Sequence, residues 1–134
     1  YDIYVIKYFL KKDKNSNKKY NLLTNEGRCS RIIGTCLHVM LTIYKKNPNA
    51  SFGFLGSHTV NLAKKEEESR ENTKRFRVYK YAIEDLFGSD NFTHFMNAEN
   101  STYLMVNNKY ESVDYLSEIA HAMFLAVFPQ LEGI

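Results

Sequence analysis

The chain has 134 residues, of which 44% are hydrophobic and 25% charged, as in an ordinary globular domain. This length is typical of one domain and no apolar stretch approaches the ~20 residues of a membrane-spanning helix, so we expect a single domain over residues 1–134 and no membrane partner. Residues 1–81 carry 17 Lys and Arg against 7 Asp and Glu, whereas residues 82–134 carry 1 Lys against 8 acidic residues. This asymmetry indicates either a basic face for an anionic partner or two halves of the chain that interleave in space.

The first predicted elements form a hairpin at the N-terminus. The chain begins with Tyr1 rather than Met, so we expect residues to be missing before it. The stretch "YDIYVIKYFL" over 1–10 is rich in Tyr, Ile, Val and Phe, which favour strands. The polar "KKDKNSNKK" over 11–19 predicts a hairpin loop, and "YNLLTN" over 20–25 predicts the returning strand.

A helix is predicted over 31–46, with Ser30 as its N-cap and Pro48 ending it. Its apolar residues recur at helical spacing: Ile32, Ile33, Cys36, Val39, Met40 and Ile43. Cys36 and Cys29 are seven residues apart, which matches neither the usual zinc-ligand spacing nor a redox C-x-x-C. We therefore predict buried free thiols in a cytoplasmic protein, with no metal and no cofactor.

The middle of the chain predicts a strand, a loop and a second helix. "ASFGFLGS" over 50–57 is short and apolar, as in a buried central strand. Residues 58–72 have no sustained helical or strand periodicity of apolar residues and predict a surface loop. The front of 73–88 alternates like a strand, but a helical reading is favoured because it aligns Phe76, Tyr79, Ile83 and Leu86 on one face, with Gly88 as C-cap.

The last predicted elements are a hairpin and a third helix. "NFTHFMN" over 91–97 and "STYLMVN" over 101–107 flank the turn "AEN". Residues 112–128 predict an amphipathic helix with an apolar stripe of Val113, Leu116, Ile119, Ala120, Met123, Phe124 and Val127. The resulting order β-β-α-β-α-β-β-α predicts an α+β fold, a two-layer sandwich in which about three helices pack on a mainly antiparallel sheet.

No strong catalytic motif is present: the chain has no G-x-S-x-G, H-E-x-x-H, Walker loop or G-x-G-x-x-G. Gly56-Ser57 directly follows the predicted central strand, where ligands gather in open sheets. A glycine lets the backbone approach an anion and a serine adds a donor, but a turn with positive φ explains the same residues.

The segment "KRFRVYK" gives a candidate basic surface. On a helix, Lys74, Arg77 and Lys80 form a ridge near the N-terminus, where peptide dipoles also attract anions. Arg75 and Arg77 suit phosphate oxygens because the guanidinium fork can donate two hydrogen bonds at once. An ordinary solvated helix face is the alternative explanation.

Residues 27–79 resemble an uncharacterised family of small proteins from Bacteroides-type bacteria, with the shared pattern N-G-D, V-L-A-T-V, P, G-S-T and R-T-R-L-Y. Gly27 matches the first glycine, "IGTC" from Ile33 to Cys36 stands where L-A-T-V would, Pro48 matches the proline, Gly56-Ser57 match G-S, and "RFRVY" from Arg75 to Tyr79 matches R-x-R-x-Y. Arg28 and His58 depart from the pattern, and a charged insertion precedes Arg75. The resemblance implies that the G-S turn and the paired arginines belong to one constellation; it implies no activity.

Three functions follow as hypotheses. The leading one is a non-enzymatic module that binds nucleic acid or a nucleotide through Gly56, Ser57, Lys74, Arg75 and Arg77. The second is a protein-interaction module, such as a phage inhibitor or an antitoxin-like adaptor, that offers a partner its acidic residues Glu84, Asp85, Asp90, Glu99, Glu111, Asp114 and Glu118. The third is a phosphate-handling enzyme with His58 as general acid or base.

Overall fold

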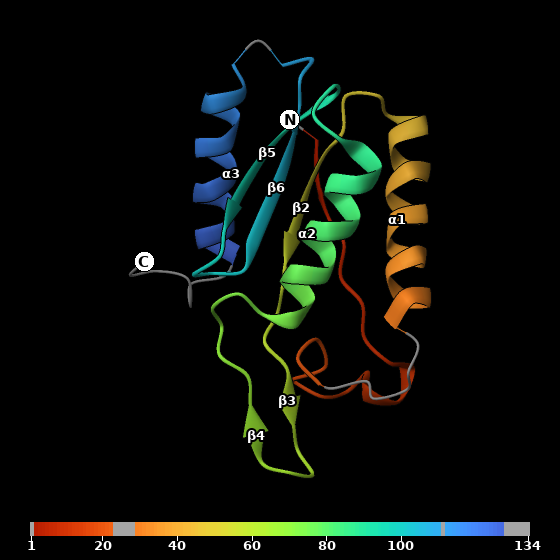
Figure 1. The fold of residues 1–134 in the computed structure, drawn as a ribbon, viewed down its shortest axis with the longest axis vertical. Helices are drawn as coiled ribbons and strands as arrows, with labels where there is room; N and C mark the ends of the chain where they lie inside the picture. The colour runs from red at the N-terminus through yellow and green to blue at the C-terminus, as the bar shows by residue number, and fades with distance from the viewer. Residues whose placement is uncertain (1, 23–28, 111, 128–134) are drawn as a thin grey trace.

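The computed structural model describes residues 2–22, 29–110 and 112–127. Six strands, three α-helices and one short 3₁₀-helix occur in the described residues (Figure 1). In chain order they are β1 (Ile3–Val5), η1 (Lys11–Asp13), α1 (Cys29–Lys46), β2 (Ser51–Leu55), β3 (Val60–Asn61), β4 (Glu66–Glu67), α2 (Lys74–Phe87), β5 (Phe92–Asn97), β6 (Thr102–Asn107) and α3 (Val113–Val127).

The main sheet has four strands in the order β1-β2-β6-β5. β2 pairs antiparallel with β6, with Phe52 opposite Met105, and β6 pairs antiparallel with β5. β1 pairs parallel with β2, so the sheet is mixed but mainly antiparallel. The predicted α+β class, with three helices packed on one such sheet, is confirmed.

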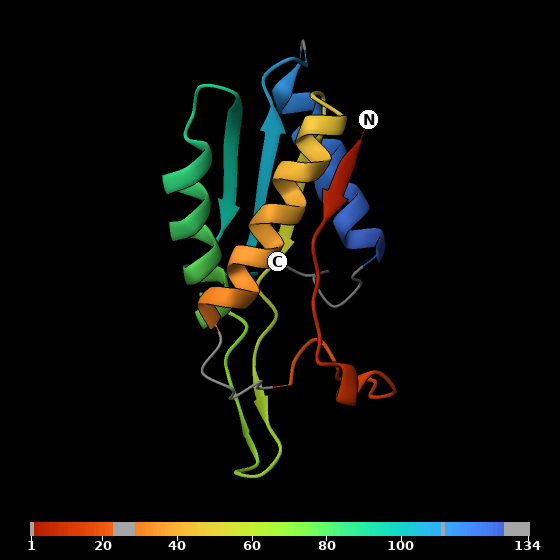
Figure 2. The same ribbon diagram turned by 90° about the vertical axis from the view of Figure 1, so that its right-hand side faces the viewer.

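Helices cover both faces of the sheet because its central strands are apolar on both sides. In β6, Tyr103 and Met105 belong to one buried cluster, while the alternating Leu104 and Val106 belong to another. The first cluster packs under α1 and α2, and the second contacts α3 through Leu116. Figures 1 and 2 show α1 and α2 on one side of the strands and α3 on the other.

The predicted N-terminal hairpin is wrong. In the described part of residues 1–10 the strand is Ile3–Val5, and its pairing partner is β2. The lysine-rich stretch turns through η1, and Leu22 then makes an isolated parallel bridge to Val60; residues 23–28 lie outside the described part of the chain. Strand propensity is local, but the open edge of the buried β2 decides the pairing.

The three predicted helices and the β5–β6 hairpin are confirmed, with shifts at their ends and faces. α1 begins at Cys29, so the predicted N-cap Ser30 is already helical. Val39, Leu86 and Met123, which were expected in the core, are exposed by 40%, 56% and 50%.

The predicted surface loop 58–72 contains a short hairpin of β3 and β4 that projects from one end of the molecule (Figure 1). We call residues 58–71 the arm. None of the described helices is long and apolar enough to span a membrane.

Candidate functional site at the start of α2

Gly56 lies where the end of β2 meets the first turn of α2. Its N–H donates to the Ser101 carbonyl at 2.8 Å, and its own carbonyl accepts from Thr73 Oγ1 at 2.5 Å. A Cβ added at Gly56 would lie 2.6 Å from Phe76 Cβ and 2.7 Å from the Phe76 nitrogen. The expected positive φ is wrong for Gly56; in the described residues it occurs at Gly88 and at the non-glycine residues Lys65, Asn72 and Ser101. The glycine is required because the backbone of α2 passes against it.

A buried polar network fixes this junction. Thr73 is the N-cap of α2, and its hydroxyl accepts from the Phe76 N–H at 3.2 Å. The Thr73 N–H donates to Ser101 Oγ at 2.9 Å, and that hydroxyl donates to the Arg70 carbonyl at 2.7 Å. Three segments far apart in sequence are thereby held at the start of α2.

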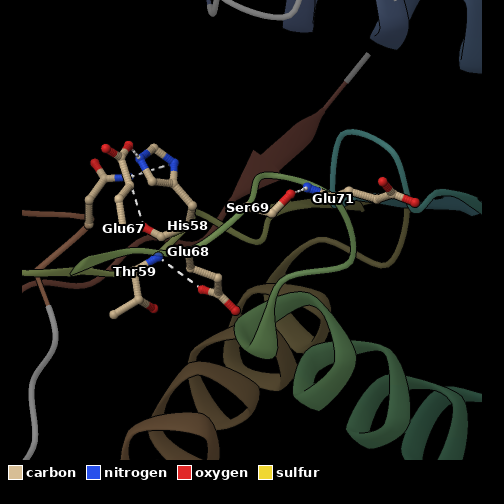
Figure 3. A network of polar contacts seen from close by, with 7 residues as sticks. His58, Thr59, Glu67, Glu68, Ser69 and Glu71 are labelled. Atoms are coloured by element: carbon tan, nitrogen blue, oxygen red, sulfur yellow. Dashed lines mark hydrogen bonds and ion pairs between the residues drawn. The ribbon is translucent and has the colours of Figure 1, made fainter.

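The anion at the start of α2 is the protein's own Glu68 carboxylate. Glu68 Oε1 accepts from the Lys74 N–H at 2.7 Å, and Oε2 accepts from the Thr59 N–H at 2.9 Å; Figure 3 shows the latter contact. Burial acts to raise the pKa of Glu68, but the Lys74 and Thr59 hydrogen bonds and the nearby Lys74 ammonium outweigh it and lower the pKa below its ordinary value. The arm is therefore tied to α2 by a carboxylate at its N-terminus.

Arg75 reaches away from Gly56 and holds the N-terminal segment. Its guanidinium donates to the Tyr20 carbonyl and, at 3.0 Å, to the Leu22 carbonyl. The same group lies over the Tyr8 ring, 5.1 Å from the centroid. Two of its donors and one of its faces are therefore used to anchor residues 8–22 against α2.

Arg77 and Lys80 line a groove on the other side of α2. The groove has a volume of about 490 Å³ and lies between α2 and the end of β5; it is lined by Asn72, Phe76, Arg77, Lys80, Tyr81, Glu84, Met96 and Ala98. Arg77 Nη1 donates to the Asn72 carbonyl. In the described residues, neither Arg77 nor Lys80 forms an ion pair.

The predicted site residues meet only in part. The backbone at Gly56, Lys74 and Arg75 does converge, because the bend after β2 packs on the first turn of α2. The two arginines diverge, since residues two apart on a helix point to nearly opposite sides. Ser57, half-buried, uses its N–H in a bond of 2.9 Å to the Leu55 carbonyl.

His58 forms a small network at the base of the arm (Figure 3). Its Nε2 lies 2.8 Å from Glu67 Oε1, and Asn21 Nδ2 lies 3.1 Å from the His58 carbonyl and 3.4 Å from Nδ1. Because Asn21 must present its amide donor to that carbonyl, Nδ1 faces a donor and the Nε2 proton points at Glu67. Both ring nitrogens of His58 therefore face a polar partner within the protein.

The acidic residues of the second hypothesis are exposed on α2, the β5–β6 hairpin and α3, except Glu111, which lies outside the described residues. Sequence reasoning missed Glu68, although Thr73 was recognisable as an N-cap ahead of an apolar helix. Sequence reasoning also assigned no binding role to the lysines before Tyr20, although their high density can be seen in the sequence.

Within the described part of the chain, no group of three or more His, Cys, Asp and Glu side chains could hold a metal ion. Comparison with protein-family models, with curated proteins and with solved structures found no match to this chain.

Proposed function

We propose that the protein binds nucleic acid through the lysine-rich segment, residues 7–22, which Arg75 holds against the start of α2. This segment carries six lysines and one acidic residue, Asp13. Five of these lysines are exposed: Lys7, Lys11, Lys12, Lys14 and Lys18. An array of positive charges along one segment suits a polymer of phosphates better than a single anion, because each phosphate contact releases counterions.

Aromatic side chains alternate with these lysines. Phe9 is 37% exposed and packs edge-on against Tyr20, with 5.5 Å between the ring centroids. The Lys19 ammonium lies 4.6 Å from the centre of the Phe9 ring. A partly open ring with ammonium groups beside it can stack on an unpaired base while the lysines contact its phosphate, which favours single-stranded nucleic acid.

The clamp by Arg75 is the observation that supports this proposal most. Without the Tyr20 and Leu22 contacts, six lysines would repel one another and the segment would lose its conformation. An arginine that orders a basic segment reduces the entropy that would be lost on binding. In this proposal Arg75 acts through the segment and not as a direct phosphate ligand.

The test is binding of a fluorescently labelled single-stranded oligonucleotide, measured by anisotropy across a range of salt concentrations. If about five phosphates are contacted, affinity falls about 100-fold between about 50 and 200 mM salt. The variant Lys11→Ala/Lys12→Ala/Lys14→Ala/Lys18→Ala should lose most of the affinity and flatten the salt dependence.

The matched control is Lys45→Ala/Lys46→Ala, which removes two exposed lysines from the last turn of α1, at the end of the molecule opposite the lysine-rich segment. It should bind like the unmodified protein. Equal losses in both variants would mean a diffuse charge effect and would overturn the proposal, as would no binding at low salt.

A further inference from the structure

In the described part of the chain, β5 is an edge strand of the main sheet and its sequence has none of the usual features that prevent pairing. β5 is the last strand in the order β1-β2-β6-β5, and no described strand other than β6 pairs with it. Edge strands are commonly kept from pairing by charged side chains, Pro, bulges or shortness. β5 has six residues, Phe-Thr-His-Phe-Met-Asn, with no Lys, Arg, Asp, Glu or Pro. The opposite edge, β1, has only three residues.

α2 lies beside this edge and runs antiparallel to β5 (Figure 2). The two elements are matched at both ends: the Asn72 N–H donates to the Ala98 carbonyl at 2.7 Å, and the Phe87 and Phe92 rings are 5.8 Å apart. The middle of α2, at Lys80 and Tyr81, therefore lies level with the middle of β5.

The groove side of α2 carries a charge pattern that is symmetric about this midpoint. Arg77 lies on one side of it and Glu84 on the other, each about 5 Å away along the helix axis. Between them Tyr81 is 78% exposed, the most exposed large hydrophobic side chain in the described residues. In those residues neither Arg77 nor Glu84 forms an ion pair.

We propose that a second copy of this chain docks on the β5 edge, so that two β5 strands pair antiparallel and form one eight-stranded sheet. The two-fold axis lies between the two β5 strands, level with their middle. It brings Arg77 of each copy opposite Glu84 of the other, and it brings the two Tyr81 rings close to each other. The interface is isologous: one surface contains both halves of each charged pair. A pattern of positive, aromatic and negative groups complements itself only in this antiparallel arrangement.

The spacing of the elements fits this arrangement. α2 packs over β2 and β6, so the two copies of α2 are separated by about four strand spacings of 4.8 Å, or about 19 Å. Helices in direct contact lie about 8–10 Å apart, so the gap requires long side chains. The groove side of α2 provides them: Arg77, Lys80, Tyr81 and Glu84. Lys80 of one copy can lie over the Tyr81 ring of the other as a cation–π pair.

The test uses two complementary variants, measured by sedimentation velocity over a concentration series. The unmodified protein should self-associate to two chains. Arg77→Glu makes positions 77 and 84 of α2 both acidic, and Glu84→Arg makes both positions basic. Each variant alone should raise the dimer dissociation constant by about tenfold or more, because each substitution places like charges together twice. An equimolar mixture of the two should form a mixed dimer that restores the lost association.

The matched control is Lys45→Glu on α1, which should leave the dimer unchanged. A second variant, Met96→Pro, removes a β5 N–H that points away from β6, because the hydrogen-bonded pairs of the β5–β6 ladder alternate from Asn91–Asn108. It should abolish association without touching the charges; circular dichroism checks that each variant folds. A monomeric unmodified protein, or a dimer indifferent to both charge reversals, would overturn the proposal. So would association that disappears after nuclease treatment, which would assign the groove to nucleic acid instead. The charge-reversal outcomes do not involve the lysine-rich segment, so they are independent of the proposed function.

Discussion

At the scale of single residues, the lack of a side chain at Gly56 has the largest structural consequence. The absence of a side chain allows β2 to end against the first turn of α2, and its two backbone groups then bond Ser101 and Thr73. Every segment described around the candidate site takes its position from this contact. The residue is explained by close packing of two backbones and not by an unusual φ.

Gly56→Ala should destabilise the protein by about 2–3 kcal/mol, because the new methyl group meets backbone atoms of Phe76 that cannot move alone. Urea unfolding followed by circular dichroism measures this loss. Gly34→Ala is the control: Gly34 is helical with nothing within 4 Å of an added Cβ, so the substitution should stabilise the protein by up to about 1 kcal/mol. A Gly56→Ala variant with the same free energy of unfolding as the unmodified protein would contradict this account.

At the scale of elements, the arm and α2 behave as one unit because Glu68 joins them. The carboxylate satisfies the N–H of Lys74 in the first turn and the N–H of Thr59 in the arm at once. Helix termini leave such N–H groups unpaired, and a partner from another element both pairs them and fixes the angle between the elements. The arm is thus anchored at its base, while its tip projects from the molecule.

This link gives a pH dependence of defined sign. Because the pKa of Glu68 is lower in the folded protein than in the unfolded chain, its contribution to stability is complete above about pH 4.5 and is lost as the pH falls below that value. Glu68→Gln should cost about 1 kcal/mol at neutral pH and almost nothing in acid. The free energy of unfolding of both proteins, measured between neutral and acid pH, checks this.

The Glu66 side chain, on the same arm, makes no such hydrogen bonds in the described structure, so Glu66→Gln serves as the control. A constant difference between Glu68→Gln and the unmodified protein at all pH values would show that the ionised carboxylate is not the cause.

At the scale of the whole molecule, charge is not sorted between two ends. The lysine-rich segment lies at the end where α2 begins, beside the arm (Figures 1 and 2). The arm itself carries four acidic residues, Glu66, Glu67, Glu68 and Glu71, and Lys45 and Lys46 lie in the last turn of α1 at the opposite end. The asymmetry along the sequence is therefore interleaved by folding, and Arg75 connects the lysine-rich segment to the core.

Arg75→Ala should release the lysine-rich segment while the sheet stays folded. Trypsin should then cleave after Lys11 to Lys19 several-fold faster, and stability should fall by about 2 kcal/mol with the loss of two charged hydrogen bonds. Mass spectrometry of the early fragments identifies the cleaved bonds. Arg31→Ala, an exposed position on α1, should change neither quantity. Unchanged cleavage in Arg75→Ala would mean that the segment is held by other contacts.

Much of the fold could be predicted from the sequence because its signals are local. Apolar residues at helical spacing identified the three helices, and two alternating runs around "AEN" identified the β5–β6 hairpin. Of the candidate site, the sequence identified the junction at Gly56 and the first turn of α2. The two-residue spacing on a predicted helix already separates Arg75 from Arg77. What each arginine contacts could not be predicted, because their surroundings come from residues 50 or more positions away or from another element.

The sequence by itself determined the α+β class, the three helices and the asymmetry of charge along the chain, since each depends on residues close together in the chain. Only the tertiary structure decided that β1 pairs with β2, that Glu68 occupies the start of α2, and that Arg75 anchors the lysine-rich segment. The physical reason is that hydrogen-bond donors and open strand edges are satisfied by whichever group packing brings within reach, and packing depends on the whole chain.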